Sequence, residues 1–145
     1  MLKTELRTVP SWLIKRAAHA LTRHAEAQLR PLGLGMASLP VLTALKNGEA
    51  ATQAELARLL QVEQPSMAQT LARLERDQLI LRRPSAAGKR AQIVEATALG
   101  RERLAQAIPA MAAGNARALA GFSREEEAVL ASLLQRVCAN LGDAP

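Results

Sequence analysis

Polar side chains gather on one short stretch of the chain, where their types suit hydrogen bonding to a nucleic acid. Five positions fall on the outward side of a predicted helix: Gln64, Ser66, Gln69, Thr70 and Arg73. Glutamine amides suit adenine, and arginine suits guanine or a phosphate. We therefore predict that this stretch contacts DNA, with further contacts from Thr52, Gln53 and Met67. The alternative is an ordinary solvated helix face.

Basic side chains follow in a loop-like segment. Between residues 82 and 90 the chain has four positive charges and no acid: Arg82, Arg83, Lys89 and Arg90. The formal net charge of the whole chain is +6, which favours a polyanionic partner. Arg83, Lys89 and Arg90 are therefore predicted to contact DNA. The alternative is a mobile charged loop tip.

The elements that hold these side chains are predicted between residues 52 and 80. Thr52 and Glu55 have the spacing of a reciprocal capping box, followed by one apolar face of Leu56, Leu59 and Leu60. A tight turn at residues 61–62 leads to a second helix with Pro65 in its first turn. Leu71 and Leu74 are its predicted buried residues. Two short helices joined in this way predict a helix-turn-helix, whose second helix enters a major groove.

Helices and one hairpin are predicted around this motif. A long amphipathic helix covers residues 11–30 after a lead-in that ends at Pro10, and a second helix, marked by apolar residues from Leu39 to Leu45, is closed by Asn47 and Gly48. The runs LILRR and AQIVEA predict two strands around a turn at residues 84–89. Thr97 caps a helix to about residue 120 that Pro109 should kink, and Ser123 with Glu126 caps the last helix.

These elements predict a mainly α fold with a small β-hairpin wing, of the α+β class. We expect a single domain over residues 1–145, with a winged helix-turn-helix lobe at 34–97. Residues 1–33 and 98–145 would form a helical dimerisation lobe, because the terminal helices carry more apolar surface than a small chain can cover. Such a homodimer would read a pseudo-palindromic operator with half-sites about 34–36 Å apart.

Residues 56–100 also carry a recurrent pattern. The run LARLLQVEQPSMAQTLARLERDQLILRRPSAAGKRAQIVEATALG resembles the winged helix-turn-helix of the MarR (multiple-antibiotic-resistance regulator) family of bacterial regulators. The matching positions are Leu56, Ala57, Val62, Pro65, Leu71, Arg73, Leu74, Glu75, Leu79, Arg82, Arg90, Thr97 and Gly100. The resemblance implies a transcriptional regulator, most often a repressor, that binds double-stranded DNA.

The resemblance also assigns particular roles and shows several departures. Arg90 resembles a minor-groove probe of the family, but Gly88 replaces the aspartate that usually orients it. In the family pattern Arg73 can instead pair with an acid and brace its helix. Gln61 replaces a small turn residue, Glu63 replaces a Ser or Thr cap, and Gln78 replaces a glycine. Each departure is expected to lower stability by several tenths of a kcal/mol without changing the fold.

A second candidate site lies on the first long helix. Trp12, Arg16, His19 and Arg23 share one stripe, and members of the family resemble switches released by aromatic carboxylates or phenols. An arginine for the carboxylate and an indole to stack on the ring would suit such an effector at Trp12, Arg16 and His19. The alternative is a solvated face, favoured for His19 and Arg23, with Trp12 packed on the partner subunit.

Other classes of function find little support. His19 and His24 lack the spacing of a metal site, and the chain has no phosphate-binding glycine loop or GxSxG motif, so no enzyme, metal or cofactor is expected. Cys138 is predicted to be a buried apolar cysteine and not a thiol sensor. With no membrane-spanning stretch or signal-like start, a cytoplasmic protein is expected. The remaining alternative is a winged-helix module that binds protein and not DNA.

Overall fold

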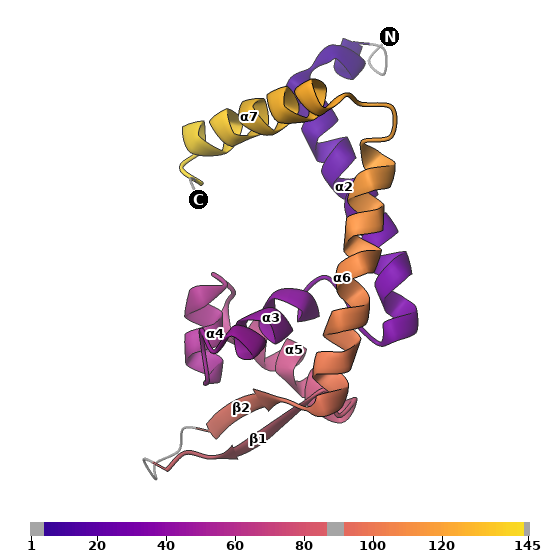
Figure 1. Ribbon diagram of the computed structural model, residues 1–145. Coiled ribbons are helices and arrows are strands. Elements are labelled where there is room, and N and C mark those ends of the chain that lie inside the picture. Colours follow the sequence, from indigo (N-terminus) through magenta and orange to yellow (C-terminus); the bar gives the residue numbers. More distant parts are fainter. Residues whose placement is uncertain (1–4, 87–91, 144–145) are drawn as a thin grey trace. The chain divides into compact units, whose positions relative to one another are not determined.

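The computed structural model describes residues 5–86 and 92–143 and divides the chain into two compact units (Figure 1). The first unit is Met1–Gly114 and the second is Asn115–Pro145. The predicted fold class, mainly α with one hairpin, is confirmed. The elements are η1 (Leu6–Thr8), α2 (Pro10–Leu29), η2 (Arg30–Leu32), α3 (Ser38–Asn47), α4 (Gln53–Leu59), α5 (Gln64–Arg76), β1 (Ile80–Pro84), β2 (Gln92–Ala96), α6 (Ala98–Ala118) and α7 (Arg124–Asn140).

The long helix α2 begins at a proline. Pro10 occupies its first turn, where a missing N–H removes no helical hydrogen bond, so the helix begins one residue before the expected Ser11. The helix ends at Leu29 and the chain turns at Gly33, which has a φ of 70°. Among the described residues of α2 only Ala25 and Leu29 are buried. The remainder of its predicted apolar stripe is therefore exposed or half-buried.

The helix α4 starts at the predicted cap with a different bonding pattern. The hydroxyl oxygen of Thr52 accepts from the N–H of Glu55 at 3.2 Å, as expected. The carboxylate of Glu55 accepts from the N–H of Ala51 at 2.7 Å, and not from Thr52, because the extended backbone of Thr52 brings the preceding amide into reach. Leu56 is buried, whereas Leu59 is 44% exposed, so the predicted single apolar face is too wide.

Two glutamines hold the left-handed backbone on either side of α5. Gln61 has a φ of 54° and Gln78 a φ of 60°, a conformation that glycine adopts most easily. The following amides close the turns: the N–H of Val62 donates to the oxygen of Ala57, and that of Leu79 to the oxygen of Leu74. Gln61 and Gln78, which depart from the recurrent pattern, thus lie where the left-handed backbone disfavours any residue with a side chain.

The hairpin is confirmed as an antiparallel pair of β1 and β2, with Arg82 opposite Val94. The N–H of Val94 also donates to the carbonyl oxygen of Ala51 at 2.7 Å, which ties the hairpin to the segment before α4. The turn residues 87–91, which include Gly88, Lys89 and Arg90, lie outside the described residues. The hairpin is therefore a bonded part of the winged lobe and not an appendage.

Thr97 and Gly100 join the hairpin to α6. The Thr97 hydroxyl accepts from the N–H of Gly100 at 3.0 Å, the predicted cap, and donates to the carbonyl oxygen of Gln78 at 2.7 Å. A Cβ on Gly100 would overlap the carbonyl oxygen of Leu79. The match of Gly100 to the recurrent pattern therefore has a steric reason, since only glycine lets α6 approach the α5–β1 turn this closely.

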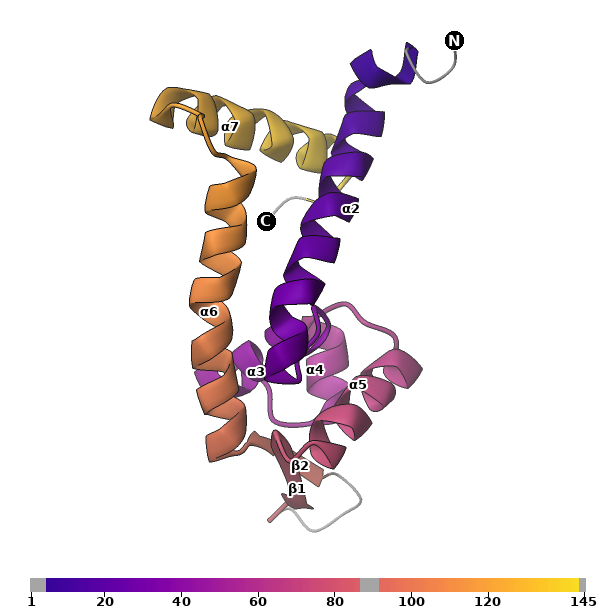
Figure 2. The same cartoon turned by 90° about the vertical axis from the view of Figure 1, so that its right-hand side faces the viewer.

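The core of the first unit lies where α3, α4, α5 and the hairpin gather around the start of α6 (Figure 2). Its largest fully buried side chains are Leu29, Val41, Leu42, Leu56, Met67, Leu71, Leu74 and Ile80. The core contains no aromatic side chain among the described residues, in keeping with a sequence whose only aromatics are Trp12 and Phe122. No helix in the described ranges is both long and apolar enough to cross a membrane.

In the second unit, α7 begins at the predicted capping box. The hydroxyl of Ser123 accepts from the N–H of Glu126 at 3.1 Å, and the Glu126 carboxylate accepts from the N–H of Ser123 at 2.9 Å. None of the described side chains of α7 is buried. Cys138 is exposed, so the prediction of a buried cysteine is wrong, because the described chain leaves the surface of this helix open.

Candidate nucleic-acid interface

The outward face of α5 is built by the residues that fix its inward face. Met67, Leu71 and Leu74 are buried and anchor the helix in the core. Pro65 lies in the first turn, and Glu63 precedes it with an extended backbone and no side-chain cap. Four of the predicted contact residues are exposed on this helix: Gln64, Ser66, Gln69 and Arg73. This face offers amide, hydroxyl and guanidinium groups to one partner surface.

Two residues predicted at this interface point elsewhere. Thr70 is buried and its hydroxyl donates to the carbonyl oxygen of Ser66 at 3.1 Å, so the expectation that Thr70 faces outward is wrong. A threonine hydroxyl in a helix can satisfy itself on the preceding turn, which allows the methyl group to pack inward. Met67 is 1% exposed and serves the core. Neither side chain presents an open surface.

Residues of three elements are brought together beside the start of α5. Gln53 on α4 donates from Nε2 to Oε1 of Gln64 at 3.2 Å. Arg82 on β1 donates from Nη1 to Oε1 of Gln53 at 3.4 Å. Thr52 lies next to Gln53, half-buried at the cap of α4. Gln53 and Gln64 were both predicted from the sequence, but no pattern indicated that they bond to each other.

Arg82 braces the wing against α5, a role that the sequence analysis missed. Its Nε lies 3.1 Å from Oε2 of Glu75, and its side chain is 22% exposed. Arg82 and Glu75 are both positions of the recurrent pattern, and this shared membership was the one signal in the sequence that could have indicated their pairing. Arg73, for which an ion-pair role was considered, is exposed and has no ion pair within the described ranges.

On the wing, Arg83 is paired in the isolated chain. Its Nη2 donates to Oε1 of Glu95 across the hairpin at 2.7 Å. This hydrogen bond lowers the pKa of Glu95 and raises that of Arg83. Both side chains are largely exposed, so solvent screens the pair and a phosphate can compete for Arg83. Lys89 and Arg90, the other predicted wing contacts, lie outside the described residues.

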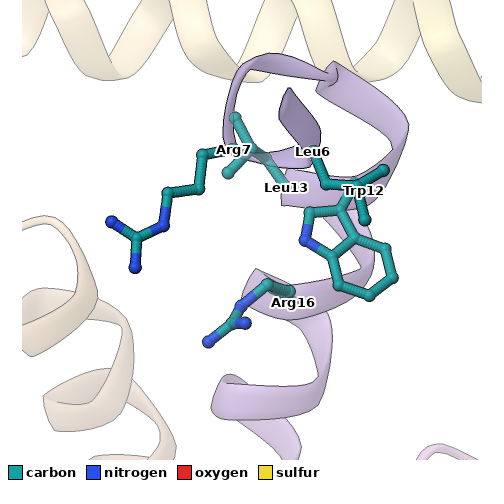
Figure 3. Close-up of a pocket in the computed structure, with 5 residues that line it drawn as sticks. All are labelled: Leu6, Arg7, Trp12, Leu13 and Arg16. Atoms are coloured by element: carbon teal, nitrogen blue, oxygen red, sulfur yellow. The ribbon is translucent and has the colours of Figure 1, made fainter. Parts of the chain in front are cut away.

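The second candidate site is a pocket at the beginning of α2 (Figure 3). Its volume is about 480 Å³, and it is lined by Leu6, Arg7, Trp12, Leu13 and Arg16. The side chains of Arg7 and Arg16 extend to the left of the segment in Figure 3, whereas the indole of Trp12 lies to the right of them. Trp12 and Arg16 are thus brought together as predicted. His19 does not line the pocket, and Arg7 was missed because it precedes the helix.

Known families and solved structures resemble this chain. A family model described as MarR family matches residues 32–91. The transcriptional regulator SlyA is 26% identical, with 92% of this chain and 94% of that chain covered and a TM-score of 0.75. The transcriptional repressor CouR, bound to a 23-mer DNA duplex, is 26% identical, with 92% and 95% covered and a TM-score of 0.78.

A variant of MarR from E. coli in complex with operator DNA shows the same fold. It is 24% identical, with 90% of this chain and 95% of that chain covered and a TM-score of 0.76. The three structures extend over almost the whole chain, whereas the family model matches only the winged lobe. The likeness therefore includes the terminal helices as well as the helix-turn-helix.

Proposed function

The chain belongs to the MarR family of transcriptional regulators, and from that premise we propose that it binds a specific double-stranded operator as a homodimer and acts as a repressor. The family and these neighbours are regulators and not enzymes. CouR is described as a repressor bound to a DNA duplex, and a MarR variant as bound to operator DNA. Those descriptions support the proposal and concern those proteins.

The outward face of α5 is the observation that carries the proposal. Gln64, Ser66, Gln69 and Arg73 are exposed, whereas buried leucines and Met67 fix the helix from behind. A recognition helix needs this arrangement, because its polar side chains must meet base edges at fixed positions. We propose that these four residues contact DNA together with Thr52 and Gln53, and that the basic wing contacts the adjoining backbone through Arg83, Lys89 and Arg90.

Binding to the DNA upstream of the protein's own gene, measured across a salt series, tests this proposal. We expect selective binding with a steep negative slope of log affinity against log salt, because contacts to phosphates release counterions. Gln69→Ala should weaken operator binding about tenfold, since one base contact is lost. Gln28→Ala, an exposed glutamine on α2, is the matched control and should leave affinity unchanged. Affinity equal to that for random DNA would contradict the proposal.

The apolar surface of the terminal helices supports the homodimer. On α2 and its N-terminal flank, Val9, Trp12, Leu13 and Leu21 are exposed, and in α7 and just after it Val129, Leu133, Leu134, Val137 and Leu141 are exposed. Surface of this extent is typical of an interface between subunits. Sedimentation should show a dimer. Leu134→Glu should raise the dissociation constant of this dimer at least tenfold, because a charge would be buried in the interface. Ser132→Glu, an exposed position on α7, is the control.

The pocket at the start of α2 supports an effector site. Two guanidinium groups and an indole line this pocket, and they suit a small aromatic acid or phenol, which would need one ion pair and one ring contact. We propose that such an effector releases the operator by favouring a dimer whose recognition helices no longer match both half-sites. A shift of this kind requires the effector to bind the two dimer states with different affinities.

A panel of aromatic acids tests the effector. We expect release of the operator by at least one member of the panel. Arg16→Ala should weaken that response about tenfold, because an ion pair to the carboxylate is lost. Arg23→Ala is the control, since Arg23 does not line the pocket. Operator affinity unchanged by every compound would contradict the effector proposal and leave DNA binding standing.

The basic wing separates this function from a protein-binding winged helix. Replacing Lys89 and Arg90 together with alanine removes two charges that a DNA contact would use. We expect operator affinity to fall at least tenfold and the salt slope to become shallower by about two. A module that binds a protein through another face would keep nearly all of its affinity for that protein. Operator affinity unchanged in this variant would contradict a contact between the wing and DNA.

A further inference from the structure

Three side chains from three elements form a chain of hydrogen bonds beside the recognition helix. Arg82 on β1 donates to Gln53 on α4, which donates in turn to Gln64, the first residue of α5. The residues are 29 and 11 positions apart in sequence. We name this arrangement the Arg82–Gln53–Gln64 relay.

The first member of the relay determines the orientation of the two amides. A glutamine side chain has an acceptor oxygen and a donor nitrogen that exchange places when the amide flips. A guanidinium can only donate. The atom of Gln53 that faces Arg82 must therefore be its oxygen, which leaves its NH₂ group toward Gln64. The atom of Gln64 that faces Gln53 must then be an oxygen as well.

Arg82 is held firmly enough to impose this order. It lies on a paired strand opposite Val94, its side chain is 22% exposed, and its Nε is 3.1 Å from the carboxylate of Glu75. That Nε has no hydrogen-bond partner within the described ranges, so its contact with Glu75 is an ion pair and not a directed bond. The second nitrogen, Nη1, is the one that reaches Gln53.

The relay leaves the NH₂ group of Gln64 as its outward group. No described residue accepts a hydrogen bond from this nitrogen, and Gln64 is exposed at the N-terminal end of α5. In a helix-turn-helix that end contacts base edges in the major groove. An NH₂ group pairs with the acceptors of guanine or thymine, whereas cytosine presents a donor. Bidentate pairing with adenine would need the oxygen of Gln64 at the base, and the relay turns that oxygen toward Gln53.

We infer that the relay presents Gln64 as a hydrogen-bond donor and selects guanine or thymine against cytosine at one position of each half-site. The inference rests on the proposed DNA-binding function. Gln64 is the residue that meets the base. Beyond the DNA contact proposed for Gln53 above, Gln53 and Arg82 act at this base as positioning residues, which set the preference through the orientation of the Gln64 amide.

Gln53→Glu tests the relay because it keeps the shape and removes the donor. The new carboxylate accepts from Arg82 and also needs a donor from Gln64. The Gln64 amide must then turn its NH₂ group inward and its oxygen outward. The preferred base at that position is expected to change to one that presents a donor, cytosine or adenine.

The experiment is selection of binding sites from a library of randomised duplexes by the full-length protein and its variants. The wild type should prefer guanine or thymine over cytosine about fivefold at one position per half-site, the effect of one hydrogen bond. Gln53→Glu should reverse that preference and leave the other positions unchanged. Gln92→Glu, the same substitution at an exposed residue of β2, controls for the added charge and should select wild-type sites.

The double variant Gln53→Glu/Gln64→Ala shows whether the effect passes through Gln64. In the Gln64→Ala background, Gln53→Glu should no longer alter the base preference, because coupled residues are not additive. Two results would overturn the relay and leave selective DNA binding standing. One is that Gln53→Glu keeps the base preference of the wild type, and the other is that Gln53→Glu changes the preference equally in the Gln64→Ala background. If the wild type selects no sequence at all, the proposed function fails and the inference fails with it.

Discussion

The helices α5 and α7 carry the same kind of sequence pattern but have different surroundings. Each is amphipathic, and each has a recognisable start, Pro65 in the first turn of α5 and the Ser123 capping box at α7. The helix α5 buries Met67, Leu71 and Leu74, whereas no described side chain of α7 is buried. An apolar stripe therefore predicts a face that needs cover, and it does not indicate what covers that face.

The two units also differ in which residues adopt the left-handed conformation. Among the described residues, the second unit has only glycine in this conformation, at Gly121 and Gly142, whereas the first unit has glycine at Gly33 and Gly48 and two glutamines as well. The winged lobe uses glutamine at positions 61 and 78, where a side chain costs about 1–2 kcal/mol relative to the right-handed conformation. The core around α5 offsets this strain. The winged lobe therefore has buried contacts that offset a local strain, whereas none of the described side chains of α7 is buried in the single chain.

Matched leucine truncations test this comparison most directly. Leu71→Ala removes a fully buried side chain and should lower the free energy of unfolding by about 3 kcal/mol at any protein concentration. Leu133→Ala removes a side chain that is 49% exposed in the single chain. Its effect should grow as the protein is diluted, because subunit association stabilises a dimer by mass action. Urea unfolding at two concentrations measures both, and equal losses would remove the distinction.

The close approach of α6 to the α5–β1 turn gives the next largest effect. Gly100→Ala places a methyl group on the backbone oxygen of Leu79, which has no rotamer to escape, and should cost about 2 kcal/mol. Gly35→Ala is the control, because its added Cβ would lie 3.4 Å from Oε2 of Glu26, an ordinary contact. Thermal unfolding compares the two. A Gly100→Ala variant as stable as the wild type would mean that the backbone of α6 or of the α5–β1 turn can shift to accommodate the methyl group.

Relief of backbone strain should have a smaller effect of opposite sign. Gln78→Gly removes the side chain at a φ of 60° and should stabilise the protein by about 0.5 kcal/mol, after the greater freedom of glycine in the unfolded chain is counted. Gln69→Gly, in the interior of α5, should instead destabilise it by about 1 kcal/mol. Chemical denaturation distinguishes the two signs. A destabilised Gln78→Gly would indicate that the side chain contributes more than its strain.

The exposed pair on the wing gives the smallest effect. The hydrogen bond from Arg83 lowers the pKa of Glu95, so the pair contributes stability above the unfolded pKa and loses it as the pH falls through the lowered value. Glu95→Gln removes this pH dependence and frees Arg83 for a phosphate. The slope of log affinity against log salt should steepen by about one. Glu102→Gln, an exposed acid on α6, is the control, and equal slopes would exclude Arg83 as a phosphate contact.

Much of the fold could be predicted because its determinants are local. The Thr97 hydroxyl, the Ser123 capping box and Gly33 each act on their neighbours in sequence, and each marks a helix end in the structure. The predictions were wrong where a polar side chain had two possible hydrogen-bond partners close in sequence. Glu55 reaches the amide of Ala51 and not that of Thr52, and Thr70 satisfies its hydroxyl on its own helix and turns inward.

The candidate sites could be predicted as sets of residues but not as geometries. Gln53, Gln64, Trp12 and Arg16 were identified by type and spacing, and the structure brings each pair together. Arg7 and Arg82 were missed because their partners lie on other elements or beyond a helix start. The exposure of Cys138 was missed for a related reason, since the sequence shows an apolar stripe and not the surface that covers it.

By itself the sequence determined the order of the helices, the helix-turn-helix, the hairpin and the resemblance to the MarR family, because these depend on capping, periodicity and short motifs. The tertiary structure alone decided which polar atoms meet. Arg82, Gln53 and Gln64 belong to three elements, and the direction of their hydrogen bonds follows from the fact that a guanidinium cannot accept. That direction exists only after the strand and both helices have packed.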